Sequence, residues 1–281
     1  MRRFAMNFRW PKYRCLPLYL MSLMGIYMSA HCFAASNQDV LNKHILQAVE
    51  VGKLSAIKAL VQEGADPETP FGDGEPAWMA ADSRDVMKFF IDNGAKINEH
   101  VKSGEDASYT ALILAAWRGH LDVCRFLLNH GADVNAATRS GNSVLMKAVD
   151  SGNAAEVLLL IQRGAKVNAQ DSGGTTALSE ASVGKITLSG TTSNAAVMRV
   201  LLDHGAKINI QGMDGSTALM TAAQFGTIDM VELLLKRGAD AKAKDSVGCT
   251  ALVRAKQVSA DQRDRLPIVR LLLKWTKISK P

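Results

Sequence analysis

Histidine and cysteine are the side chains of this 281-residue chain that could most readily bind a metal or act as a base or nucleophile. The histidines after residue 35 are His44, His100, His120, His130 and His204. No two of them have the spacing of metal ligands, and no cysteine pair supports a zinc site. His130 and His204 each precede a glycine that ends an expected helix, so they should contact the last carbonyls of that helix. The sequence therefore predicts no metal and no cofactor.

Serine, aspartate and glycine are plentiful, but none falls in a catalytic or phosphate-binding motif. Gly173, Gly174 and Gly215 lie in expected turns, without the strand-to-helix context of a phosphate loop. We therefore expect no catalytic residue and no small-molecule substrate. The rival class is an enzyme or effector that uses the rest of the chain only to find its target. A contiguous polar pocket beside residues 183–193 would favour that class.

Residues 1–34 have the composition of a secretory signal peptide. Five cations without an acidic residue precede the apolar run from Leu16 to Ala30, and small residues follow. We expect cleavage after Ala34, with Ala30 as the second choice. The alternative is an uncleaved membrane anchor, because the apolar stretch counted on to Ala35 reaches 20 residues. The five cations are Arg2, Arg3, Arg9, Lys12 and Arg14.

The positive charge of the chain belongs to this leader. The whole sequence has 33 basic and 27 acidic residues, and removal of the five leader cations leaves 28 basic residues against 27 acidic ones. Binding to nucleic acid requires clustered, uncompensated cations. A nearly neutral mature chain without such a cluster predicts no nucleic-acid partner.

A short triplet, Gly-Ala-Asp or Gly-Ala-Lys, recurs along the rest of the chain. The intervals between successive triplets are 30, 37, 33, 41 and 33 residues. A period near 33 is typical of units that are helix pairs, each of which buries its apolar face only against its neighbours. The triplets begin at Gly64, Gly94, Gly131, Gly164, Gly205 and Gly238.

The unit over 215–240 carries the clearest motif: Gly-Ser-Thr-Ala-Leu-Met-Thr-Ala-Ala, then Gly226, Met-Val-Glu-Leu-Leu-Leu and Gly-Ala-Asp. It resembles the ankyrin repeat, and the unit from Thr110 to Asn135 resembles it equally well. The resemblance implies an all-α ankyrin-repeat solenoid of about seven helix-pair repeats with short β-hairpin-like fingers. Its implied domain spans 38–281, with repeats that end near residues 67, 98, 135, 168, 209 and 241 and a capping repeat over 245–277.

The chain departs from the ankyrin pattern at one recurring position and in three insertions. The histidine of the family's Thr-Pro-Leu-His motif, which links adjacent repeats by hydrogen bonds, is missing, so apolar packing should carry more of the cohesion. Residues 183–193 are rich in Gly, Ser and Thr and predict a flexible loop; 258–267 and 103–106 are further insertions. Insertions in solenoids often mark the binding face, although surface loops also tolerate extra length. The replacements for the histidine are Ile113, Ser179, Met220 and Val253.

The resemblance also implies which residues bind a partner. In ankyrin proteins the two residues after the paired small residues, together with the finger tips, face a concave surface. Aromatic residues and arginine commonly anchor protein interfaces. The alternative is that Trp117 packs over a neighbouring repeat and Phe225 over a finger. The candidate binding residues are Trp117, Arg118, Asp150, Gln224 and Phe225, with Arg139 and Met213 in the fingers.

These observations predict a non-catalytic protein-binding module that is exported to the periplasm or secreted. The chain looks similar to exported ankyrin proteins of bacteria, which suggests a role as an inhibitor or protector of another exported protein. A membrane-tethered scaffold is the alternative if the leader stays attached. The sequence does not identify the partner.

Overall fold

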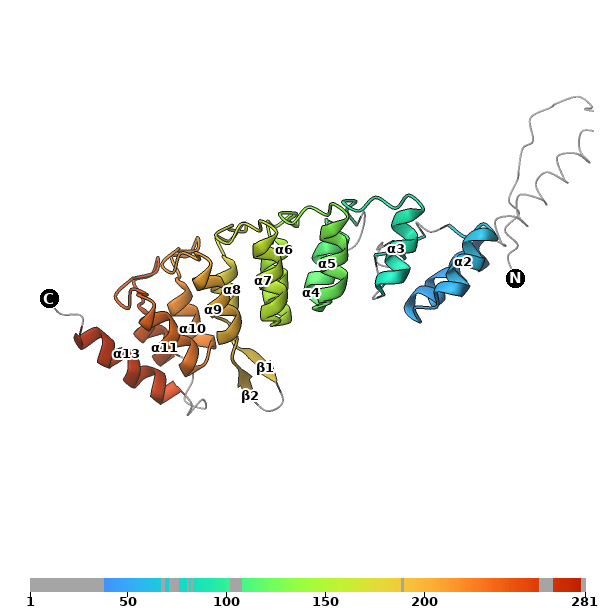
Figure 1. The fold of residues 1–281 in the computed structure, drawn as a ribbon. Helices are drawn as coiled ribbons and strands as arrows, with labels where there is room; N and C mark the ends of the chain where they lie inside the picture. The colour runs from blue at the N-terminus through green and yellow to red at the C-terminus, as the bar shows by residue number, and fades with distance from the viewer. Residues whose placement is uncertain are drawn as a thin grey trace, which may run out of the picture.

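Helices stacked side by side in one row make up the described part of the computed structural model (Figure 1). The described residues are 38–66, 69–70, 76–79, 81, 83–101, 108–187, 190–257 and 265–278. The expected signal peptide, with Ala30 and Ala34, lies outside them. So do the insertion at 103–106 and residues 258–264 of the last insertion.

The row has two layers, because first helices contact first helices and second helices contact second helices of successive repeats. The first layer comprises a helix over 38–50, α4 (Ala111–Arg118), α6 (Val144–Ser151), α8 (Ala177–Ala181), α10 (Ala218–Phe225) and α12 (Ala251–Gln257). The second comprises α2 (Leu54–Gln62), α3 (Arg84–Asp92), α5 (Leu121–Asn129), α7 (Ala154–Gln162), α9 (Ala195–Asp203), α11 (Ile228–Lys236) and α13 (Leu266–Ile278). The predicted all-α solenoid is confirmed.

Recurring residues set the ends of the first helices. The hydroxyl that precedes α4, α6, α8 and α10 accepts a hydrogen bond from the amide three residues later, as in Thr110 with Ile113 and Thr217 with Met220. This N-cap satisfies a donor that the helix itself cannot pair. Gly119 ends α4 in the left-handed region, at φ +77°, which glycine adopts without strain. The repeated sequence motif is therefore largely a set of helix start and stop signals.

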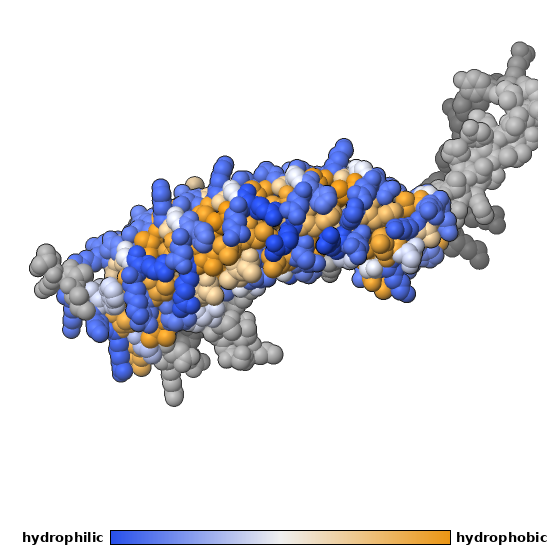
Figure 2. Space-filling model, viewed as in Figure 1, coloured by the Kyte–Doolittle hydropathy of each residue, from blue (hydrophilic) through white to orange (hydrophobic). Residues whose placement is uncertain are grey.

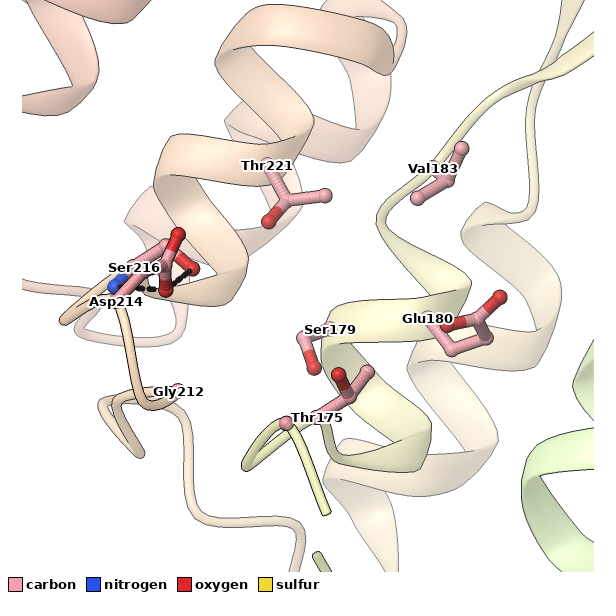
Figure 3. A pocket seen from close by; sticks show the side chains of 9 residues that line it. Thr175, Ser179, Glu180, Val183, Gly212, Asp214, Ser216 and Thr221 are labelled. Carbon is pink, nitrogen blue, oxygen red and sulfur yellow. Dashed lines mark hydrogen bonds between the residues drawn. The ribbon is translucent and has the colours of Figure 1, made fainter. Parts of the chain in front are cut away.

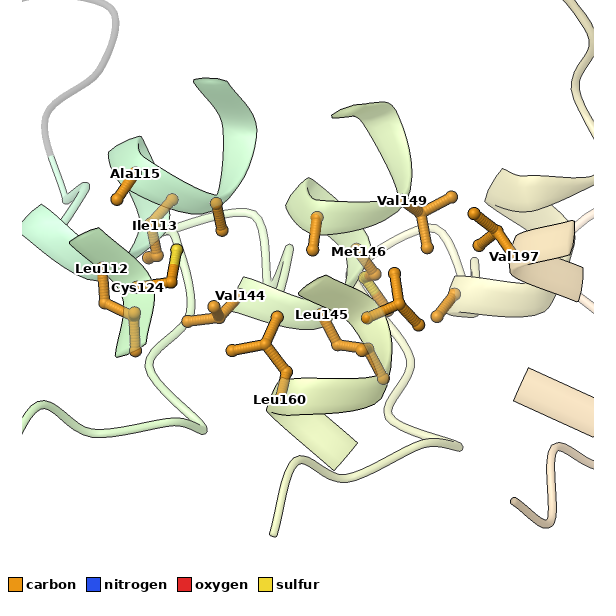
Figure 4. Packing of buried hydrophobic residues seen from close by; sticks show 14 of the residues in the cluster. Leu112, Ile113, Ala115, Cys124, Val144, Leu145, Met146, Val149, Leu160 and Val197 are labelled. Carbon is orange, nitrogen blue, oxygen red and sulfur yellow. The ribbon is translucent and has the colours of Figure 1, made fainter. Parts of the chain in front are cut away.

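The core lies between the two layers and runs through the repeats without a break (Figure 4). Leu145 of α6 and Leu160 of α7 are almost fully buried, as is Cys124 of α5. Cys124 is therefore packed as a small buried hydrophobe, and Cys124 and Cys249 are both free thiols. On the face seen in Figure 2, apolar residues continue along the row between polar ones.

The second repeat departs from the helix-pair expectation. Residues 77–79 form a turn where the other repeats have a first helix, and α3 is the helix of this repeat in the described residues. Pro76 bridges Pro70 just before the turn. The backbone N of a proline cannot donate a helical hydrogen bond, and the residue before it disfavours the helical region, so this sequence starts a helix poorly.

The loop predicted over 183–193 is instead an antiparallel hairpin, and that prediction was wrong. Strand β1 (Lys185–Thr187) pairs with β2 (Gly190–Thr192), with Lys185 opposite Thr192 and Thr187 opposite Gly190. Isoleucine and threonine favour strands, and they outweigh the glycine and serine content of the segment. The hairpin extends from the end of α8, on the side of the row away from the finger loops (Figure 1). The Gly184 amide donates to the Phe225 carbonyl (3.3 Å), which ties its base to α10.

Asparagine side chains link successive repeats, so hydrogen bonds add to the apolar packing between them. Each asparagine donates from Nδ2 to the carbonyl of the glycine that begins the next triplet. Its Oδ1 accepts from the backbone amide two residues after that glycine. The pairs are Asn98 with Gly131 and Asp133, Asn135 with Gly164 and Lys166, and Asn168 with Gly205 and Lys207, at 2.7–3.2 Å.

The fingers form a second set of links. Isolated antiparallel bridges close them, as between Ala137 and Ser143 and between Gln211 and Thr217, which confirms their β-hairpin-like character. One finger bonds to the next through the backbone, for example from the Met213 amide to the Gly173 carbonyl (2.9 Å). The fingers thus link neighbouring repeats in addition to the packing of their helices.

Candidate binding surface

The two aromatic candidates lie at the ends of first helices and are half exposed. Trp117 ends α4 with 51% of its surface accessible, and Phe225 ends α10 with 50%. Helices α6 and α8 lie between them in the row, so they form two separate apolar points on one layer. Met213, in the finger before α10, is more exposed still, at 82%. We call the exposed sides of α4, α6, α8, α10 and α12 the first-helix face.

Several polar candidates already have partners within the chain. The Arg118 guanidinium donates to the Met79 carbonyl (3.3 Å) and so ties α4 to the turn of the second repeat. Gln224 accepts a hydrogen bond from Arg254 (3.5 Å). These contacts link neighbouring repeats and give both side chains a structural role.

Asp150 also has a charged partner within the chain, whereas Arg139 is exposed. Asp150 lies 3.7 Å from the Lys147 ammonium of its own helix. Arg139 is exposed in its finger, and its backbone amide donates to the Ser108 hydroxyl (2.7 Å). The structure thus places the candidates along the row without gathering them into one cluster.

A polar pocket that the binding-residue prediction missed lies between α8 and α10 on the first-helix face (Figure 3). Its volume is about 300 Å³. One wall comes from α8 and the finger before it, and the other from α10 and its finger. The lining residues are Gly173, Thr175, Ser179, Glu180, Val183, Gly212, Asp214, Ser216 and Thr221.

Small side chains create this pocket. At the position of Ser179 in the repeat, α4 has Ile113, α6 has Met146 and α10 has Met220, all with 2% or less of their surface exposed. Serine leaves that volume unfilled, and Thr221 of the facing helix does not fill it. The sequence signal was visible, because Ser179 is the one small polar residue among the four replacements for the missing histidine.

The hydroxyls around the pocket take part in local structure. The Ser179 hydroxyl donates to the Thr176 carbonyl (2.9 Å) and accepts from the Thr176 amide (2.8 Å), which completes a capping box. Thr221 donates to the Thr217 carbonyl (3.3 Å). An activated nucleophile needs a base within hydrogen-bond reach. Neither of these two hydroxyls has such a contact, whereas the Ser216 hydroxyl donates to the Asp214 carboxylate (2.6 Å); the nine lining residues contain no histidine. A contiguous polar pocket of the kind that would favour the enzyme or effector class is therefore present beside residues 183–193.

Two carboxyl groups give the pocket its charge. Asp214 accepts hydrogen bonds from the Ser216 hydroxyl (2.6 Å) and amide (2.9 Å), and these hold the pKa of its carboxyl below the usual value. Burial raises the pKa of Glu180, and the neighbouring Asp150 carboxylate raises it further, whereas Lys147 lowers it. Figure 3 shows Asp214 beside the start of α10 and Glu180 on the side of α8 away from it.

A third carboxyl group, Glu156 of α7, is buried away from the pocket. It accepts hydrogen bonds from the Cys124 thiol (2.9 Å) and the Ser151 hydroxyl (3.2 Å). Burial raises the pKa of Glu156 and of the Cys124 thiol. A thiol is nucleophilic only as the thiolate. This arrangement therefore makes Cys124 an unreactive structural donor rather than a catalytic one.

The histidine prediction is confirmed at two positions. Nδ1 of His130 lies 2.8 Å from the Phe126 carbonyl, and Nδ1 of His204 lies 2.8 Å from the Val200 carbonyl. Across the described ranges, no group of three or more His, Cys, Asp or Glu residues is arranged to hold a metal ion. Within the same residues, every helix is too short or too polar to cross a membrane.

Comparison with known families assigns the fold. A family model described as ankyrin repeats (3 copies) matches residues 45–138 and 188–280, and one described as ankyrin repeats (many copies) matches 127–181. The chain belongs to the ankyrin repeat family. The ankyrin fold is a non-catalytic interaction fold whose members generally bind protein partners.

A relative among curated proteins is the protein named Putative palmitoyltransferase ZDHHC13, from Danio rerio. It is 29% identical to this ankyrin protein over 224 residues, which are 79% of this chain and 33% of the relative. The chain thus spans a third of the relative's length. The activity in the relative's name belongs to that longer protein.

Proposed function

We propose that this ankyrin protein is exported and binds a protein partner through the first-helix face, with Trp117 and Phe225 as apolar anchors. The observation that carries the proposal is their half exposure at the ends of α4 and α10, on a layer held by core packing and inter-repeat hydrogen bonds. Large aromatic side chains on a rigid surface bury much area at little entropic cost. The partner docks without a large rearrangement of the solenoid.

The leader supports export, and the repeat architecture supports binding rather than catalysis. On this proposal the chain acts by occupying another exported protein, as an inhibitor or protector. The alternative is a scaffold that the uncleaved leader tethers to a membrane. Sequencing the amino terminus of the protein isolated from soluble and membrane fractions separates the two. A start at residue 35, in the soluble fraction, supports export with cleavage; an intact residue 1 in the membrane fraction supports the tethered scaffold.

Quantitative affinity purification with cross-linking tests the binding face. Wild type is compared with Trp117→Ala, Phe225→Ala and the control Leu266→Ala, which removes an equally exposed apolar residue (60%) from the start of α13. We expect Trp117→Ala to lower the recovery of the bound protein at least tenfold, as for an aromatic hot spot, and Leu266→Ala to leave it unchanged. Equal recovery by all four proteins contradicts the proposal.

A further inference from the structure

We propose that the pocket between α8 and α10 binds the side chain of a lysine or arginine that the protein partner presents. The inference rests on the proposed function, because it assigns one feature of the partner that docks on the first-helix face. It identifies the residue class that the pocket recognises and the residues of this chain that recognise it.

The size of the pocket suits one side chain. Sites for small molecules commonly measure about 300–1,000 Å³, and this pocket, at about 300 Å³, is at the lower limit of that range. It opens on the first-helix face beside exposed residues of that layer. A residue in an extended segment of a docked partner therefore reaches it without unfolding.

The polarity of the walls selects a cation. Asp214 and the hydroxyls of Thr175, Ser179 and Thr221 line the pocket, and Glu180 lines it from the far side of α8, where its carboxyl group also interacts with Asp150 (Figure 3). Ammonium and guanidinium groups carry several donors and no acceptor, so a wall of carboxylate and hydroxyl oxygens matches them. The same wall repels a carboxylate or phosphate, since none of the nine lining residues is basic.

The cations of the neighbouring helices already have carboxylate partners, and each also lowers the pKa of a pocket carboxyl group, Arg254 that of Asp214 and Lys147 that of Glu180. Arg254 donates to the Asp245 carboxylate through two nitrogens (2.6 and 2.9 Å). Lys147 lies 3.7 Å from Asp150. Asp171 and Asp150 add negative charge near Glu180. The carboxylates of the pocket and its surroundings therefore outnumber the cations that could neutralise them, and a bound cation relieves this repulsion.

Apolar residues at the rim fit the hydrocarbon stem of such a side chain. Val183 lines the pocket and is 40% exposed. Phe225, four residues after Thr221 on α10, lies one helical turn further along that helix. Lysine and arginine bury their methylene groups against apolar surface while the charged end is solvated or paired. The pocket thus offers contacts to both parts of the side chain.

Nuclear magnetic resonance titration of the purified protein with small probes tests the pocket without the partner. The probes are N-acetyl-arginine amide, N-acetyl-lysine amide and N-acetyl-citrulline amide, the last being a neutral analogue of the first. We expect the two cations to shift the amide signals of Gly212, Ser179 and Thr221 saturably, and more weakly as salt rises. Citrulline should shift them little. Equal shifts with all three probes, or shifts confined to other residues, overturn the inference.

Three variants sharpen the test. Glu180→Gln removes a carboxylate at constant size and should weaken arginine binding about tenfold. Ser179→Met restores the large residue found at this position in α6 and should abolish binding by filling the pocket. Glu232→Gln, which removes an exposed carboxylate paired with Lys236 in α11, should have no effect. Thermal melting confirms that each variant is folded, and equal weakening by Glu180→Gln and Glu232→Gln contradicts a specific pocket.

The outcomes separate this inference from the proposed function. If the probes do not bind but recovery of the partner still depends on Trp117, the pocket assignment fails and the binding face remains. If the probes bind but no variant of the face changes partner recovery, the pocket is real and the proposed face is wrong. If the pocket instead binds a basic side chain of a second copy of the chain, the protein should self-associate with rising concentration, and Ser179→Met should abolish this association. That outcome would identify the partner as a copy of the chain.

Discussion

Two junctions between first helices, α4 with α6 and α8 with α10, have the same backbone plan and opposite surfaces. At the first junction Ile113 and Leu114 are buried and close the interface. At the second, Ser179 and Glu180 occupy the same repeat positions, and a pocket opens. The solenoid therefore tolerates a polar opening at one junction. Ankyrin stacking depends on the sum of many neighbour contacts, so one junction can exchange packing for a binding site.

We call the α4–α6 junction the closed junction and the α8–α10 junction the open junction. The largest expected effect comes from removing a buried side chain at the closed junction. Leu114→Ala removes a side chain that is 2% exposed and should lower the free energy of unfolding by about 2–5 kcal/mol. The matched change at the open junction is Thr221→Ala, at the same repeat position of α10. It removes one intrahelical hydrogen bond and should cost about 1 kcal/mol or less. Urea unfolding followed by circular dichroism measures both. Equal losses would show that the two junctions are packed alike.

The fingers link the two repeats of the open junction, and a substitution at Gly174 should disrupt that link. A Cβ at Gly174 would lie 2.8 Å from the Met213 amide nitrogen of the next finger, and Gly174 has φ +75°. Gly174→Ala should therefore lower the free energy of unfolding by about 2–4 kcal/mol, because alanine disfavours the positive φ and because its Cβ forces the two fingers apart. Gly248, with φ +82° and open space around its Cβ position, is the control. Gly248→Ala should show only the conformational part, about 1–2 kcal/mol. If Gly174→Ala and Gly248→Ala lower the free energy of unfolding equally, the close approach of the fingers contributes nothing to stability.

The asparagine links sharpen the comparison further. Asn135 bonds across the closed junction to Gly164 and Lys166, whereas Asn209 accepts from the Asp240 amide (2.9 Å) across the open one. Either change to alanine should cost about 1–2 kcal/mol. Because the open junction has less apolar packing, Asn209→Ala should also split urea unfolding into two steps, while Asn135→Ala keeps one. Hydrogen exchange of α11 and α9 shows whether the repeats on the two sides separate. A single transition in both variants contradicts unequal coupling.

The sequence was sufficient for the features that each repeat specifies by itself. The ankyrin-like motif and the triplet glycines predicted the helix pairs, except in the second repeat, and the carbonyl contacts of His130 and His204 followed from their positions. The pocket and the asparagine links need two repeats at once. Ser179 and Thr221 are 42 residues apart in sequence, and only stacking shows that their small volumes face each other. The hairpin was missed because glycine and serine content was weighed above the strand preference of Ile186 and its threonine neighbours.

The carboxyl groups of Glu156 and Glu180 test the contrast between the closed and the open junction through the smallest expected effects. Burial raises the pKa of Glu156, which lies among uncharged donors where the third and fourth repeats meet, and of Glu180, which lines the pocket beside Asp150. A pKa raised in the folded state means that the stability from protonation is complete below the unfolded value, near 4.3, and is lost as the pH rises through the folded value. Glu156→Gln should therefore raise the urea midpoint at pH 7.5 with an unchanged m-value. The gain should disappear near pH 4, where wild type carries the proton.

Glu180→Gln should behave in the same way with pH, since the same sign applies to its carboxyl. The two variants should differ in binding alone: Glu180→Gln loses affinity for N-acetyl-arginine amide, and Glu156→Gln keeps it. Glu232→Gln, in an exposed ion pair, should change the midpoint little at either pH, because such pairs contribute about 0.3–0.5 kcal/mol. If Glu156→Gln lowers the midpoint at pH 7.5, the Cys124 and Ser151 hydrogen bonds stabilise the carboxylate more than burial destabilises it. The closed junction would then contain a charge, and the contrast with the pocket would be one of access rather than polarity.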